Sequence, residues 1–220
     1  MAAENGIPED LFVGQPVIEA RWRLRNGALP LKNRHTRALA ACGLSIGLLS
    51  WARQHIEWTL TEGSVECPDG VLVLDVDAQG RAVMRVEPYE PLPPLTAALM
   101  LERALGQSDR PVEDEVVWLV RGGRLFALTD ARKAPSGVNS LVIDLAHTLH
   151  LEPSFEGHLE PATALATLAP ADECFLASDE HGIVPSADHD GPVAANFVSY
   201  YGRLLDGTKP DRMGQAVGRR

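Results

Sequence analysis

The sequence predicts an α/β protein made of two parts. Stretches with the apolar alternation of strands and stretches with the apolar period of helices are interspersed along its 220 residues. Four prolines gather at residues 88–94 and mark a boundary, because proline suits neither the middle of a helix nor that of a central strand. The composition, 45% hydrophobic and 23% charged, is typical of a globular protein.

These observations predict the domain organisation. We expect a loose arm over residues 1–14 and a smaller N-terminal α/β unit over residues 15–90. A larger unit follows over residues 91–205, and a polar tail closes the chain over residues 206–220.

The smaller unit begins with a strand. From Ile18 to Arg25 apolar and charged residues alternate, which predicts a strand with one exposed face. Asn26-Gly27 predicts a hairpin turn, with a short return strand ending at Pro30. The apolar run 38–52 predicts a buried helical segment that could form a subunit contact, so we expect a homodimer. The remaining predicted elements are a helix over 48–60 and strands over 71–77 and 81–87.

The larger unit alternates strands and helices. Proline directly after Glu160 and directly after Gly191 is typical of a first helical position. The predicted helices end at residues 105, 149, 168 and 205, and the predicted strands cover 112–120, 125–129, 173–177 and 183–185, with an extended piece over 153–159.

Charge and cysteine content exclude some functions. A net charge of −10 argues against a broad nucleic-acid surface. The run 38–52 is too short for a membrane span, and the polar residues 1–10 do not resemble a secretion signal. The three cysteines lack metal-site spacing and indicate a reducing compartment, so we expect a cytoplasmic protein.

The stretch Pro135 to Ser140 could hold an anion. Small and hydroxylated residues precede a helix there, so backbone N–H groups of the first turn point outward along a favourable dipole. An ordinary helix cap, with Ser136 accepting from the first turn, explains the same residues. Both interpretations remain open from the spacing alone.

The order of the segments in the larger unit resembles the class IV aminotransferases, the fold-type-IV pyridoxal phosphate (PLP) enzymes. That family includes D-amino-acid and branched-chain aminotransferases and aminodeoxychorismate lyase. Residues 136–140, Ser-Gly-Val-Asn-Ser, resemble its Pro-Gly-Ile-Thr-Arg helix start. Residues 171–178, Ala-Asp-Glu-Cys-Phe-Leu-Ala-Ser, resemble its Asp-Glu-Val-Phe-Leu-Thr-Ser strand. Residues 182–185 and 190–191 resemble the segment after that strand.

The smaller unit carries a second part of the resemblance. Residues 34–37, Arg-His-Thr-Arg, resemble the family's His-x-x-Arg helix start, with the arginine one residue closer. The resemblance implies a two-part class IV aminotransferase-like fold with a phosphate pocket between its halves. The residues that it assigns to the phosphate or another anion are Arg37, Gly137, Val138, Asn139, Ser140 and Ser178.

The chain departs from the family in its lysines. PLP chemistry needs a lysine amine that forms a Schiff base, and the family places it in the region that matches residues 94–114, which contains none. The whole chain has only Lys32, Lys133 and Lys209. Lys133, just before the anion-type turn, is the candidate catalytic lysine. PLP is thus implied by the resemblance and disfavoured by the missing lysine.

Two other sets of residues carry less chemistry. His147 and His150 share a helix face, and Asp188-His189-Asp190 sits in a turn, but neither set completes a metal site, so we expect no metal. The run Ser178 to His181 holds the residue types of a catalytic triad, yet neighbours in a turn point in different directions.

Three functions remain open. The chain could be a PLP enzyme, an aminotransferase or lyase, in which a residue such as Lys133 replaces the usual lysine. It could be a PLP-independent enzyme that binds a small anionic metabolite through Arg37 and the turn at residues 137–140. It could also be a non-catalytic binding or partner subunit on the same fold, since fold alone does not decide function.

Overall fold

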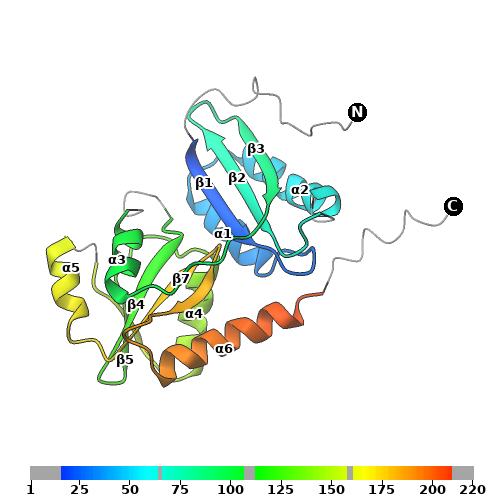
Figure 1. Cartoon of the computed structure of the whole chain (residues 1–220). Coiled ribbons are helices and arrows are strands. Elements are labelled where there is room, and N and C mark those ends of the chain that lie inside the picture. Colours follow the sequence, from blue (N-terminus) through cyan, green and yellow to red (C-terminus); the bar gives the residue numbers. More distant parts are fainter. Residues whose placement is uncertain (1–15, 64–65, 107–111, 158–160, 210–220) are drawn as a thin grey trace.

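A computed structural model describes residues 16–63, 66–106, 112–157 and 161–209 (Figure 1). The predicted arm and most of the predicted tail lie outside these residues. The elements of the N-terminal half are β1 (Pro16–Arg23), α1 (Lys32–Ala41), α2 (Ile46–Gly63), β2 (Val71–Asp77) and β3 (Ala82–Glu87). Those of the C-terminal half are α3 (Ala97–Leu105), β4 (Glu115–Arg121), β5 (Arg124–Ala127), α4 (Gly137–Thr148), β6 (Pro153–Phe155), α5 (Pro161–Leu168), β7 (Glu173–Ser178), β8 (Gly182–Pro185) and α6 (Pro192–Gly207).

The N-terminal half is an antiparallel sheet covered by helices. Its strand order is β1-β2-β3, and α2 packs its buried Ala52, Ile56 and Leu60 against apolar side chains of β1 and β2. The predicted return strand before Pro30 is wrong, because only an isolated bridge joins Arg25 to Ala28.

The predicted buried helical segment over residues 38–52 is also wrong. Gly43 adopts a φ of 76° between α1 and α2 and breaks the segment there. Ile46, at the start of α2, is 85% exposed. The predicted homodimer is not tested by this geometry and stays a prediction.

The C-terminal half has three layers. Its sheet has the order β6-β5-β4-β7-β8, antiparallel except for the pair β5 and β6. Alternate residues of β4 face opposite sides, as strand geometry requires. Trp118 packs with α4 and α6 on one face, whereas Val117 and Leu119 pack with α3 and α5 on the other. Figure 1 shows these two pairs of helices on opposite sides of the sheet.

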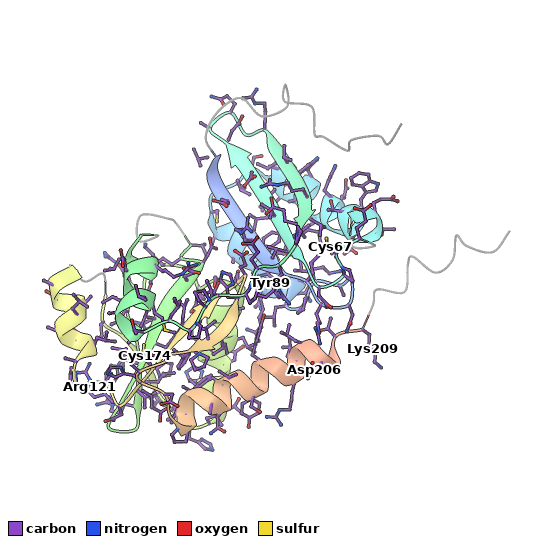
Figure 2. All side chains as sticks on the ribbon, in the orientation of Figure 1. Cys67, Tyr89, Arg121, Cys174, Asp206 and Lys209 are labelled. Atoms are coloured by element: carbon purple, nitrogen blue, oxygen red, sulfur yellow. The ribbon has the colours of Figure 1, made fainter. Side chains whose placement is uncertain are left out.

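The two halves meet where β7 ends. Arg23 N donates to the backbone oxygen of Asp179 at 3.0 Å. Arg21 forms a two-pronged ion pair with Glu180, with Nε 2.6 Å from one carboxylate oxygen and Nη2 3.0 Å from the other. The Arg23 guanidinium stacks 3.2 Å above the ring of Tyr89, which Figure 2 shows at the junction of the halves. The predicted boundary near residue 90 falls between the two sheets, while their independence as domains stays a prediction.

Candidate functional site

The anion-type turn begins α4 as the sequence predicts. Ser136 has extended backbone angles, and its side chain accepts a hydrogen bond from the backbone N–H of Asn139, so it caps the helix. The next N–H groups, those of Gly137 and Val138, lie in the first turn, where no earlier carbonyl of the helix can accept from them.

An internal carboxylate accepts from these groups. Asp179 Oδ1 accepts from Val138 N at 2.7 Å and from Ser136 Oγ at 2.9 Å. Asp179 Oδ2 accepts from Gly137 N at 3.1 Å and lies 3.0 Å from His35 Nδ1. The Asp179 residue is 1% exposed. The turn is therefore an anion site, and its anion belongs to the chain itself.

The carboxyl of Asp179 is held in its charged form. Burial by itself raises the pKa of this carboxyl. The charge and hydrogen bond of His35, with the hydrogen bonds from Val138 and Ser136, outweigh burial and lower the pKa below its ordinary value. Because an ionised carboxylate only accepts hydrogen bonds, His35 Nδ1 is the donor.

This lowered pKa predicts an acid-labile contact. The unfolded carboxyl titrates near pH ~3.9, so its stabilising contribution is complete above about pH 5 and is lost as the pH falls through the lower folded pKa. Urea unfolding at pH 6, 5, 4 and 3 should show a steeper loss of stability in the wild type than in Asp179→Asn, which cannot titrate there. Parallel profiles for the two proteins would contradict this prediction.

The four donors come from both halves of the protein. His35 lies on α1 and is 2% exposed, whereas Ser136, Gly137 and Val138 begin α4. A Cβ atom added to Gly137 would lie 2.2 Å from His35 Nδ1, so only glycine lets the ring approach the turn. The Asp179 carboxylate thus joins α1 to α4.

A further chain of hydrogen bonds supports the turn. Trp118 Nε1 donates to Asn139 Oδ1 at 2.9 Å, and Asn139 Nδ2 donates to Ser136 Oγ at 2.9 Å. Trp118 and Asn139 are both buried. The predicted anion ligand Asn139 therefore directs its side chain toward Trp118 and Ser136.

Ser140 and Ser178 have other partners. Ser140 Oγ accepts from Arg34 Nη1 at 3.0 Å and donates to Gly137 O at 2.8 Å. Ser178 Oγ accepts from His181 N at 3.1 Å, which closes the turn after β7. Of the predicted anion-binding residues, Gly137 and Val138 meet at the carboxylate through their N–H groups. Binding of an external anion by this set stays a prediction.

Arg37 lies on another face of α1. Residues two apart on a helix point in nearly opposite directions, so Arg37 cannot share the buried face of His35. Its side chain is exposed, its Nε donates to Asn33 O at 3.3 Å, and it lines a surface groove with Arg53 and Glu57 of α2. The structure does not bring Arg37 to the turn.

The candidate lysine is held by a carboxylate. Lys133 Nζ lies 2.7 Å from Glu113 Oε1, and Thr129 Oγ1 donates to the other oxygen of Glu113. Lys32 Nζ pairs with Glu57 in the smaller half. Lys209 follows the end of α6, at the periphery of the molecule (Figure 2).

The cofactor implied by the resemblance can be tested against these residues. The N–H groups that would receive its phosphate already bind Asp179. The crevice beside that carboxylate, bounded by Trp22, His35 and Asp114 among others, has a volume of about 30 Å³. Such a space admits a few waters at most and not a phosphorylated pyridine ring. The residues at this turn therefore do not fit the phosphate and ring of PLP.

His35 and Asp179 are the site residues that sequence reasoning missed. Asp179 directly follows Ser178, and an acidic residue is favoured at a helix N-terminus. Residue 179 meets the start of α4 only in the folded chain. The preference of an acidic residue for a helix N-terminus could therefore identify Asp179 only once this contact was known. Among the described residues, no group of three or more His, Cys, Asp or Glu side chains could hold a metal ion, and no helix is long and apolar enough to cross a membrane.

No family model and no curated protein matches the sequence. Solved structures match the fold. A candidate 4-amino-4-deoxychorismate lyase from Legionella pneumophila is 10% identical with a TM-score of 0.62, over 93% of this chain and 96% of that chain. The 4-amino-4-deoxychorismate lyase from Pseudomonas aeruginosa is 19% identical with a TM-score of 0.55, over 86% and 90%. A hypothetical aminotransferase from Mycobacterium tuberculosis, bound to α-ketoglutarate and PMP, is 13% identical with a TM-score of 0.56, over 86% and 87%. The predicted class IV aminotransferase-like fold is confirmed.

Proposed function

We propose that this chain, with its class IV aminotransferase-like fold, is a binding protein that carries out no PLP chemistry. The observation that carries the proposal is the Asp179 carboxylate in the anion-type turn. Of the functions left open by the sequence, this is the non-catalytic one.

Electrostatics supports the proposal. Two like unit charges 4 Å apart repel by about 4 kcal/mol at the effective dielectric constant of a protein. A phosphate of charge near −2 beside the buried Asp179 carboxylate would meet about twice that repulsion. It would also have to displace the carboxylate from Gly137 and Val138, which supply the backbone donors of the turn.

The positions of the lysines also support the absence of PLP chemistry. The region 94–114 has no lysine. Lys133, the candidate nearest the turn, is engaged by the buried Glu113. An ammonium that is held in an ion pair is a poor nucleophile, because the nucleophile is the neutral amine.

The test is PLP titration with absorbance spectroscopy, followed by borohydride reduction and peptide mapping. We expect the spectrum of free PLP and no site-specific adduct. Pyridoxal without its phosphate is the matched control, because it labels exposed lysines such as Lys209 without using a phosphate site. A Schiff-base band with an adduct on Lys133 that PLP forms and pyridoxal does not would overturn the proposal.

A further inference from the structure

A cavity of about 160 Å³ lies beside the first turn of α4, between β4, β6 and residues 129–135. Neither Asp179 nor His35 lines it. Its lining consists of Glu113, Val116, Trp118, Thr129, Asp130, Ala131, Lys133, Ala134, Pro135, Asn139, Ile143 and Phe155. The cavity is therefore separate from the carboxylate that fills the turn.

One wall of the cavity is apolar and aromatic. Trp118 is 1% exposed, and its ring meets that of Phe155 edge to face with centroids 6.3 Å apart. Val116 and Ile143 extend this wall. An apolar cavity of about 150 Å³ can admit a benzene ring, so this one has room for a single ring or a short branched chain.

The polar end of the cavity presents a buried carboxylate. The described lining contains the carboxylates of Glu113 and Asp130 and the ammonium of Lys133, and Asp130 is paired with Arg132, which does not line the cavity. Glu113 is buried and accepts from Lys133 and Thr129. A carboxylate has about four acceptor positions, so Glu113 can accept a further donor beside these two. The open acceptor positions of this buried carboxylate favour a ligand that donates hydrogen bonds, such as an ammonium group, over an anionic ligand.

The geometry points to a binding site for a small primary amine that carries one ring or a branched apolar chain. The ammonium group binds Glu113, and the apolar body lies against Trp118 and Phe155. Lys133 competes with the ligand for the same carboxylate, and its side chain, 24% exposed, can turn toward solvent when the ligand binds. The inference names a ligand class for the proposed binding function and does not depend on the filled anion turn.

Calorimetric titration with benzylamine, benzyl alcohol and benzoate tests the ligand class on the unmodified protein. The three probes share one ring and differ in the charge of the head group. We expect saturable binding of benzylamine, at least tenfold weaker binding of benzyl alcohol, and no binding of benzoate, because hydrogen bonds to a charged group contribute about tenfold or more in affinity. Equal binding of the three probes, or no binding of benzylamine, would overturn the inference.

Variants at the two ends of the ion pair give opposite expected results. Glu113→Gln should weaken benzylamine binding at least about tenfold, and Lys133→Gln should strengthen it, because it removes the competing ammonium. Glu115→Gln is the matched control, since Glu115 is equally buried and paired with Arg103 but does not line the cavity. If Glu113→Gln fails to fold, the affinity of Lys133→Gln for benzylamine and the binding of the three probes to the unmodified protein still test the inference. A weaker affinity in Lys133→Gln would contradict the inference, whereas a PLP adduct in the earlier experiment would contradict only the loss of PLP chemistry.

Discussion

Asp179→Asn should destabilise the protein by about 3–5 kcal/mol. The substitution leaves one carbonyl oxygen for donors from Ser136, Gly137, Val138 and His35, and it leaves the buried His35 without its carboxylate partner. Removing one member of a buried pair costs this much because the other stays buried and unpaired. For a chain of this length the melting temperature should fall by roughly 10 °C or more.

Urea unfolding and calorimetry measure this effect. Asp144→Asn is the control, because the Asp144 carboxylate also has a basic partner, Arg34 at 2.7 Å, but is mostly exposed. Such a surface pair contributes about 0–1 kcal/mol. If Asp179→Asn were as stable as Asp144→Asn, the carboxylate would not hold the two halves together.

The companion variant Asp179→Ser should convert the turn into a site for external anions. It removes the carboxylate while the N–H groups of Gly137 and Val138 keep their helical positions. Inorganic phosphate at 100 times its dissociation constant should then restore about 2.7 kcal/mol of stability. The wild type should show no comparable response, and an equal response in both proteins would place the phosphate elsewhere.

Gly137→Ala should be the second most damaging substitution at the site. The added Cβ would lie 2.2 Å from Nδ1 and 2.5 Å from Cε1 of His35, so the ring must move away from the Asp179 carboxylate. Overpacking costs about 1–3 kcal/mol, and loss of the hydrogen bond between His35 and the buried Asp179 carboxylate adds to it, so we expect a loss of about 3 kcal/mol.

A double-mutant cycle with His35→Ala tests that cause. In the His35→Ala background the added methyl group meets no ring, so Gly137→Ala should cost much less, and the coupling between the two sites should exceed about 1 kcal/mol. Gly202→Ala is the control, because that glycine lies within α6 with nothing within 4 Å of its added Cβ. It should raise stability by about 0.5–1 kcal/mol. Additive effects of His35→Ala and Gly137→Ala would rule out the steric explanation.

Local patterns predicted most of the fold because they depend on neighbours in sequence. The alternation before Asn26-Gly27, the prolines at residues 161 and 192, and the cap at Ser136 each set one element, and the structure contains those elements. The single helical segment predicted over residues 38–52 was wrong, because hydrophobicity alone does not predict the positive φ of Gly43. In such cases a single backbone angle decides between one helix and two.

The content of the candidate site could be predicted only in part. From the spacing, the turn at residues 137–140 could hold an anion or be an ordinary helix cap, since helix geometry leaves its first N–H groups without partners. The sequence could not predict that the anion is Asp179, because residues 35, 137 and 179 come together only through the packing of α1, α4 and β7. Arg37 was assigned by analogy with a motif whose spacing this chain does not keep, and one change of spacing on a helix changes the face.

The position of Asp179 makes the anion of this turn a tethered ligand. A group fixed to the same chain has an effective concentration set by geometry, commonly millimolar or higher, and is never diluted. A free phosphate must exceed that concentration or bind far more tightly before it can replace the carboxylate. The contact between the two halves at Asp179 is therefore insensitive to the concentration of free anions around the protein.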